Sequence, residues 1–169
     1  VIYNNELKLV REILQAARES GISAIIAADP SVIQLSRKEG MQVHLSTQLN
    51  ISNLESLKFY SEFADVVVLA RELDLKQIKA VATGIRTEDI RGPSGQLIRI
   101  ELFVHGALCM AISGKCYLSL HQYGYSANRG ECLQACRRSY IVEEKETGKQ
   151  LEIDQEYIMS PKDLCTIPY

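Results

Sequence analysis

One short apolar run, DVVVL at residues 65–69, carries the clearest structural signal in the chain. Four apolar residues follow an aspartate, and three of them are β-branched valines. Such a run is typical of a strand that is buried on both faces of a sheet. Strands of this kind occur in parallel sheets that are covered by helices, so the run predicts an α/β protein.

The segments on both sides of this run alternate between helix and strand. Strands are predicted over 24–28, 43–45, 66–69 and 97–104, and helices over 6–20, 30–40, from a cap at Asn50 or Ser52 through 60, and 73–82. Residues 86–96 are predicted to form a loop. Strands that recur about every twenty residues, with a helix in each gap, indicate parallel strands joined by crossover helices.

The length of the chain limits how much of a barrel it can form. A complete (β/α)8 barrel needs about 250 residues, and the chain has 169. We therefore predict a partial TIM-like (β/α) barrel over residues 1–104, and we expect the chain to be a fragment that starts near the end of a strand at 1–3.

The last part of the chain has a different pattern. Residues 141–144 and 151–153 flank a turn at Thr147-Gly148 and predict a β-hairpin. Residues 157–159 predict a final barrel strand. The predicted organisation is thus a βα-repeat region over 1–104, a cysteine-rich insert over 105–140, and the hairpin with the final strand over 141–169.

Composition indicates an ordinary cytoplasmic protein. The chain is 46% hydrophobic and 24% charged, with a formal net charge of −2. No apolar run approaches the roughly 18 residues that a membrane helix requires. Residues 1–10 do not have the basic flank and apolar run of a secretion signal. We expect no membrane association.

Four cysteines define the predicted metal site. Cys109, Cys116, Cys132 and Cys136 lie within 28 residues, with six, fifteen and three residues between them. Thiolates are soft ligands that select zinc or an iron–sulfur cluster. Because only the last spacing is typical of zinc, a cluster is favoured and zinc is the alternative. The fifth cysteine, Cys165, is predicted to pack in the core, and disulfides are disfavoured without a secretion signal.

The cysteine-rich region is also locally basic. Residues 105–140 contain one lysine and three arginines against Glu131 alone, whereas residues 143–156 contain six acids and two lysines. Arg129, Arg137 and Arg138 are predicted to bind the carboxylate or phosphate of a substrate, because guanidinium groups pair with both in a bidentate manner. The alternative is that they only balance the thiolates and the acidic stretch that follows.

Polar residues that follow the predicted strands are candidates for catalysis, because barrel enzymes place their sites at the carboxyl ends of the strands. The candidates are Ser46, Gln48, Arg71, Glu72 and His105, joined by Lys162 and Asp163 after the last predicted strand. The first five have structural alternatives: helix capping for Ser46 and Gln48, an ion pair for Arg71 and Glu72, and a satisfied core histidine for His105.

Longer motifs add a resemblance to a known family. ELFVHGALC at 101–109 and SGKCYLS at 113–119 resemble the signature of the collagenase-like peptidase family of unassigned catalytic type. HLSTQ at 44–48, LARE at 69–72, NRG at 128–130 and SPKDLC at 160–165 are similar to further motifs of that family. The resemblance implies a TIM-like barrel from which the opening strands and the part after Pro168 are missing, and in which the 86–96 loop is longer than usual.

The resemblance implies two kinds of activity. The family was first described as proteases, some of them collagenases. Other members support oxygen-independent hydroxylation of a tRNA uridine with prephenate, of ribosomal RNA, or of a ubiquinone precursor. Those proteins hold a 4Fe-4S cluster on four cysteines, and the matching positions here are Cys109, Cys116, Cys132 and Cys136. The implied partners are RNA, with tRNA first, or a protein substrate.

The residues themselves disfavour proteolysis. None of the three histidines stands in a His-Glu-x-x-His motif, and no Gly-x-Ser-x-Gly motif occurs. His105 lies four residues from Cys109, but a cysteine that binds a metal is not free to attack a peptide bond. From the sequence we therefore favour an iron–sulfur protein for hydroxylation of RNA. The alternatives are a collagenase-like peptidase, and an RNA- or partner-binding module with a structural metal.

Overall fold

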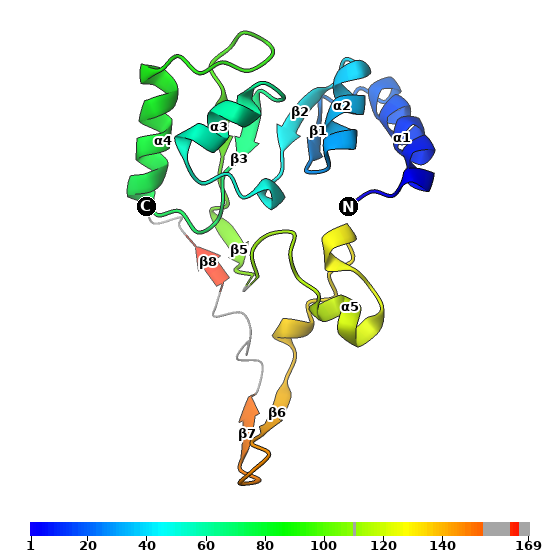
Figure 1. Ribbon diagram of the computed structural model, residues 1–169, viewed down its shortest axis with the longest axis vertical. Coiled ribbons are helices and arrows are strands. Elements are labelled where there is room, and N and C mark those ends of the chain that lie inside the picture. The colour runs from blue at the N-terminus through cyan, green and yellow to red at the C-terminus, as the bar shows by residue number, and fades with distance from the viewer. Residues whose placement is uncertain (110, 154–162, 166–169) are drawn as a thin grey trace. The chain divides into compact units, whose positions relative to one another are not determined.

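The computed structural model describes residues 1–109, 111–153 and 163–165 (Figure 1). The chain forms two compact units, Val1–Leu102 and Phe103–Tyr169.

The first unit contains a four-stranded sheet in the order β1-β2-β3-β4, in which all neighbours are parallel. A crossover helix follows each of the first three strands, which confirms the predicted α/β architecture (Figure 1). Among the described residues these strands do not close into a barrel, so the partial barrel stays a prediction. The elements in chain order are η1 (Asn4–Glu6), α1 (Leu7–Glu19), β1 (Ala24–Ala27), α2 (Pro30–Lys38), β2 (Gln42–Leu45), η2 (Thr47–Leu49), α3 (Leu54–Ser61), β3 (Val66–Val68), α4 (Leu75–Thr87) and β4 (Arg99–Glu101).

The core lies on one face of this sheet. Val43, Leu45 and Val67 point to that face and pack in one cluster with Leu57 of α3 and Val81 of α4. Each buried aliphatic side chain of this kind contributes about 1.5–3 kcal/mol. These contacts hold α3 and α4 against β2 and β3.

The opposite face carries alternate residues of the same strands, and none of them belongs to a hydrophobic cluster. Ile26 is 63% exposed, and Arg99 and Glu101 are exposed, whereas Val66 and Val68 of β3 on the same face are buried. The exposed side chains of this face thus belong to the two edge strands, β1 and β4.

Local capping fixes where the helices begin. Pro30 is the first residue of α2, and the Asp29 carboxylate accepts the Ser31 N–H at 3.0 Å. The α3 helix begins later than predicted, because Asn53 caps it and accepts the Ser56 N–H at 2.9 Å. Asn50, one of the two predicted caps, instead ends η2 in a left-handed conformation with φ 54°.

Other boundaries also differ from prediction. Residues 1–3 form no strand. The α4 helix continues to Thr87, five residues beyond the predicted end, because its capping box at Asp74 and its buried Val81 and Ile85 stabilise a longer helix. β4 covers only Arg99–Glu101 of the predicted 97–104 strand.

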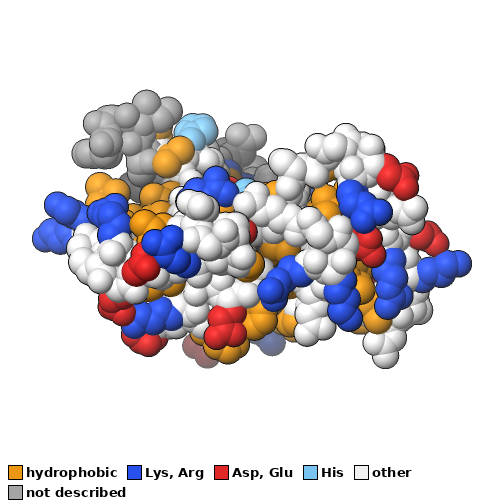
Figure 2. Space-filling model, turned by 90° about the horizontal axis from the view of Figure 1, so that it is seen from above, with side chains coloured by type: hydrophobic (Ala, Val, Ile, Leu, Met, Phe, Trp, Pro, Cys, Tyr) orange, Lys and Arg blue, Asp and Glu red, His pale blue; other side chains and the backbone are white. Residues whose placement is uncertain are grey.

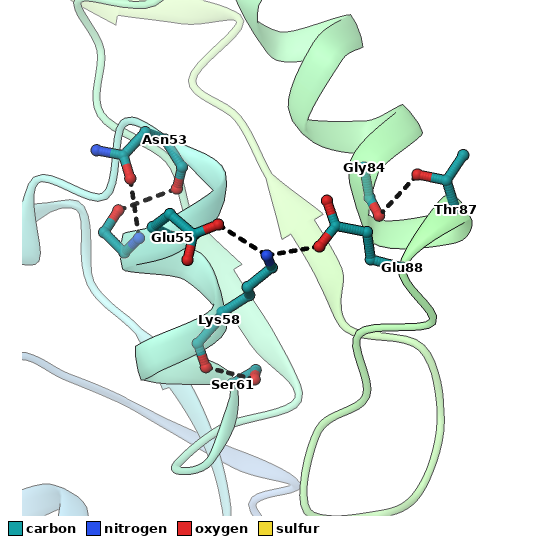
Figure 3. A network of polar contacts seen from close by, with 8 residues as sticks. Asn53, Glu55, Lys58, Ser61, Gly84, Thr87 and Glu88 are labelled. Carbon is teal, nitrogen blue, oxygen red and sulfur yellow. Dashed lines mark hydrogen bonds and ion pairs between the residues drawn. The ribbon is translucent and has the colours of Figure 1, made fainter.

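An ion pair connects α3 to the end of α4 (Figure 3). The Lys58 ammonium donates to Glu55 at 2.7 Å and lies 2.5 Å from a carboxylate oxygen of Glu88. The hydrogen bond to Glu55, followed by that to Glu88, raises the pKa of Lys58. The three charges therefore form one small network between neighbouring crossover helices.

The second unit is built from short elements. β6 and β7 form the predicted antiparallel hairpin, and the Glu144 carboxylate accepts the Thr147 N–H at 2.9 Å in its turn. The predicted strand over 157–159 lies outside the described residues. The elements are β5 (His105–Ala107), α5 (Leu118–Tyr123), η3 (Ala127–Arg129), η4 (Ala135–Arg137), β6 (Tyr140–Glu143), β7 (Gln150–Ile153) and β8 (Asp163–Cys165).

Charges of both signs are interspersed on the face shown in Figure 2, in keeping with the net charge of −2. Within the described part of the chain, no helix combines the length and apolarity needed to cross a membrane.

Candidate cysteine-rich site

The segment from Cys109 to Cys136 folds as a series of tight turns. α5 ends at Gly124 and η3 ends at Gly130, with φ of 75° and 99°. Glycine adopts this left-handed region without the steric cost that other residues incur. The chain can therefore reverse direction twice between Cys116 and Cys132.

Hydrogen bonds tie together the parts that carry the cysteines. The Cys116 N–H donates to the Asn128 side chain at 2.8 Å. The Leu133 N–H donates to the hydroxyl of Ser119 at 3.1 Å, and Ser119 is buried. The Tyr140 hydroxyl donates to the Ala135 carbonyl at 2.6 Å, next to Cys136. These bonds hold Cys116, Cys132 and Cys136 in one folded segment.

All five cysteines are free thiols. Cys109 and Cys132 are exposed, whereas Cys116 and Cys136 are half-buried. Burial raises the pKa of Cys136, the charges of Cys109 and Cys132 act in the same direction, and Arg137 opposes them. The charges of the other three cysteines of the predicted metal site, Cys116 included, thus all act to raise the pKa of Cys136.

The ligand type of these four thiols fits a soft metal or an iron–sulfur cluster. The positions of the four sulfurs do not yet form a metal site: over residues 1–109, 111–153 and 163–165, no three His, Cys, Asp or Glu side chains form a group that could hold a metal ion. The electrostatic effect on Cys136 is compatible with this finding, because charges act over longer distances than metal–sulfur bonds. The cluster and the zinc alternative therefore stay predictions.

The basic residues of this segment lie among exposed tyrosines. Tyr117 is 68% exposed and Tyr125 is 50% exposed. The guanidinium of Arg138 lies 4.9 Å from the ring centre of Tyr123. Arg129 and Arg137 are half-buried. A surface that combines aromatic rings with arginines is suited to stacking of nucleic-acid bases and to phosphate binding.

The predicted catalytic residues of the first unit lie at the carboxyl ends of two neighbouring strands. Ser46 directly follows β2 and accepts the Gln48 N–H at 3.2 Å, which is the capping role that we gave as its structural alternative. Arg71 and Glu72 follow β3; the first is half-buried and the second is exposed. β2 and β3 are paired, so the structure brings these four positions to one edge of the sheet.

The remaining candidates belong to the second unit. His105 is exposed in β5, so it is not a satisfied core histidine. Asp163 is the first residue of β8, and Lys162 lies outside the described residues. The core prediction for Cys165 is wrong, because this residue is exposed at the end of β8. Within the part of the chain that the structure describes, its strand pairs with β5 alone, and such a two-stranded ladder offers little burial.

One polar pair in the first unit, His44 and Glu101, was not predicted from the sequence. The Nδ1 atom of His44 lies 3.8 Å from a carboxylate oxygen of Glu101, on the face of the sheet opposite the core. The alternation of His44 between the buried residues Val43 and Leu45 was the signal that it faces away from the core. That His44 lies near Glu101 could not be predicted, because it depends on the register in which β2, β3 and β4 pair.

Fold and site together define a class of α/β protein in which a parallel βα region precedes a four-cysteine segment. The chain belongs to peptidase family U32, which matches it over residues 1–169. No solved structure matches the chain.

The chain is similar over almost its whole length to proteins named as proteases and to proteins named for tRNA hydroxylation. It is 56% identical over its entire length to a collagenase of Porphyromonas gingivalis, covering 41% of that protein, and 42% identical to an uncharacterized protease of Methanocaldococcus jannaschii, covering 40% of it. It is 35% identical over 98% of its length to a tRNA hydroxylation protein of Bacillus subtilis, covering 38% of that protein. The chain thus spans about two fifths of the length of these relatives.

Proposed function

We propose that the protein acts as a collagenase-like peptidase. The observation that carries this proposal is the ranking of similarity: identity is 56% to a protein named collagenase and 35% to a tRNA hydroxylation protein. The higher identity to the collagenase favours the peptidase, which was an alternative to RNA hydroxylation when only the sequence motifs were considered. The absence of known peptidase motifs does not count against it strongly, because unrelated folds arrange nucleophile and base in different chain orders.

Gelatin, which is denatured collagen, is the substrate that tests this proposal. The purified protein should generate new amino termini in gelatin, and heat-unfolded protein should generate none. Gelatin that keeps its original termini after prolonged incubation with folded protein contradicts the proposal.

A second candidate is hydroxylation of RNA, and a specific observation supports it: the segment that carries the four cysteines also carries exposed tyrosines and an arginine that lies over a tyrosine ring. In this candidate Cys109, Cys116, Cys132 and Cys136 hold a 4Fe-4S cluster, which supplies electron transfer when bound. Arg129, Arg137 and Arg138 pair with phosphate or with the carboxylates of prephenate. Tyr117 and Tyr125 offer exposed rings on which bases stack.

Two measurements on protein purified without air test the second candidate. A cluster predicts about four iron and four sulfide per chain. Incubation with unmodified tRNA and prephenate should add one oxygen atom to a uridine, as seen by nucleoside mass spectrometry. Zinc in place of iron, together with tRNA binding but no added oxygen, would instead indicate the binding module with a structural metal.

A further inference from the structure

A pocket of about 540 Å³ lies in the first unit, at the amino-terminal ends of its strands. Its walls come from the first residues of β2 and β4, Gln42 and Arg99, from Asp65 just before β3, and from the 91–97 loop. Pockets that hold small organic ligands measure about 300–1,000 Å³. The candidate catalytic residues follow the carboxyl ends of β2 and β3, so this pocket is separate from them.

Hydrogen bonds fix the loop that forms one wall of the pocket. Arg91 and Leu97 are joined by an antiparallel bridge at the base of the loop. Ser94, nearer its tip, donates both its N–H and its hydroxyl to the Asp65 carboxylate. The pocket is therefore preformed, and a ligand binds without first having to order the loop.

Arg99 supplies the unused hydrogen-bond donors of the pocket. Its side chain is exposed, and among the described residues its guanidinium has no hydrogen-bond or ion-pair partner. The positive charge of Arg99 acts on the Asp65 carboxylate, but that carboxylate already accepts hydrogen bonds from Ser94 and from the Gln42 side chain. The planar fork of Arg99 is therefore available to an anion that enters the pocket.

Arg91 adds a second guanidinium, and this one is held in place. It donates to the two carboxylate oxygens of Asp89, at 2.9 and 2.8 Å, and to the Gly95 carbonyl at 2.6 Å. These contacts use three of the five N–H donors of a guanidinium and leave two. Because Asp89 balances its charge, Arg91 contributes directed hydrogen bonds to the pocket, whereas Arg99 contributes charge as well.

We propose that this pocket binds a small organic molecule through a phosphate monoester group. Arg99 pairs with the phosphate in a bidentate manner, and the two remaining N–H groups of Arg91 bind a further oxygen. A phosphate monoester offers three terminal oxygens and a charge of about −1.5 to −2, whereas the two oxygens of a carboxylate are satisfied by one guanidinium. The pocket is larger than a phosphate group, and the amides of Gln42 and Gln96 in its lining can bind the hydroxyl groups of an attached sugar. This site goes beyond the proposed peptidase function and does not depend on it.

Titration calorimetry with ribose 5-phosphate tests the site. Ribose 5-phosphate should bind to one site per chain, ribonate, the corresponding sugar acid, should bind more weakly, and ribose should give no measurable binding. Arg99→Gln should weaken the binding of ribose 5-phosphate about 10-fold or more, the usual effect of losing a hydrogen bond to a charged group. Arg99→Lys keeps the charge without the planar fork and should lose less. Arg11→Gln, a change to an exposed arginine of α1, is the matched control and should leave the affinity within about twofold of wild type.

Urea unfolding gives a second measurement, because a ligand that binds the folded state raises the unfolding midpoint. Ribose 5-phosphate should raise the midpoint of the wild type and of Arg11→Gln, but not that of Arg99→Gln. The midpoints without ligand show that each variant folds. The proposal is overturned if the wild type does not bind ribose 5-phosphate at millimolar concentration, or if ribose or ribonate binds as tightly. Equal affinities of Arg99→Gln and Arg11→Gln for ribose 5-phosphate also overturn it.

Discussion

Replacement of Asp65 should strongly destabilise the first unit. Asp65 precedes β3 and is only 9% exposed. Its carboxylate accepts the Ser94 N–H at 3.0 Å and the Ser94 hydroxyl at 2.7 Å, so it fastens the 92–95 turn to the start of the central strand. Gly92 is necessary for this approach, since a Cβ there would lie 2.4 Å from an oxygen of Asp65.

The size of the effect follows from these two hydrogen bonds. A hydrogen bond to a charged group contributes about 1.5–3 kcal/mol. Because water can reach the exposed Ser94 once the carboxylate is gone, we expect Asp65→Ala to lower the free energy of unfolding by about 2–4 kcal/mol, less than the sum of two full bonds. Asp65→Asn retains an acceptor without the charge and should lose roughly half as much.

The pH dependence identifies the cause. Burial raises the pKa of Asp65, but the side-chain and backbone hydrogen bonds from Ser94, a hydrogen bond from Gln42 and the charge of Arg99 together outweigh it, and the net pKa is lowered. A carboxyl group with a lowered folded-state pKa contributes stability above its unfolded pKa of about 3.9, and this contribution is lost as pH falls through the folded-state pKa. The difference between wild type and Asp65→Ala should therefore be largest near neutral pH and should shrink in acid.

Urea unfolding followed by circular dichroism measures both effects. Glu62→Ala is the control, because Glu62 is an exposed acid three residues before Asp65 and its right-handed backbone, with φ −64°, accepts alanine without strain; its unfolding midpoint should shift much less. A midpoint for Asp65→Ala equal to that of Glu62→Ala, or a difference from wild type that is the same at neutral and acidic pH, would refute the reasoning.

The remaining predictions concern packing and the tyrosine surface. Gly92→Ala should cost about 1–3 kcal/mol in urea unfolding, because the new Cβ would also lie 2.9 Å from the Ala64 carbonyl, which cannot move aside easily. Leu57→Ala should cost about 2–5 kcal/mol, since Leu57 is fully buried; Phe59→Ala, at a 62% exposed position of the same helix, should cost less, and equal losses would contradict the assigned core. If RNA is a ligand, Tyr117→Ala should weaken tRNA binding by about 1–3 kcal/mol in a filter-binding titration, and an unchanged affinity would argue against base stacking at this position.

The sequence predicted those elements of the fold that depend on local signals. β1 and β3 are short apolar runs, and β2 contains the apolar residues Val43 and Leu45. Asp29 and Pro30 mark the start of α2, and Gly40 lies two residues after its end at Lys38. The α3 start was missed because Asn50 and Asn53 carry the same capping group, and only the left-handed conformation of Asn50 separates them. Such a choice depends on the path of the chain rather than on residue type.

Pairing between distant segments was not predictable in the same way. β5 and β8 have three residues each, too few for an alternation pattern, and they meet only through tertiary structure. The exposure of Cys165 depends on this pairing, so its residue type alone gave the wrong burial. The four clustered cysteines were easier to recognise because they lie close together in sequence, but their spacing does not determine how their sulfurs are arranged.

The most direct test of the account is a count of new amino termini in gelatin that has been incubated with purified protein and a metal chelator. We predict that the folded wild type generates new termini and that the same protein after heat unfolding does not. The account is contradicted if wild type leaves gelatin intact while the same preparation, without chelator, adds oxygen to tRNA.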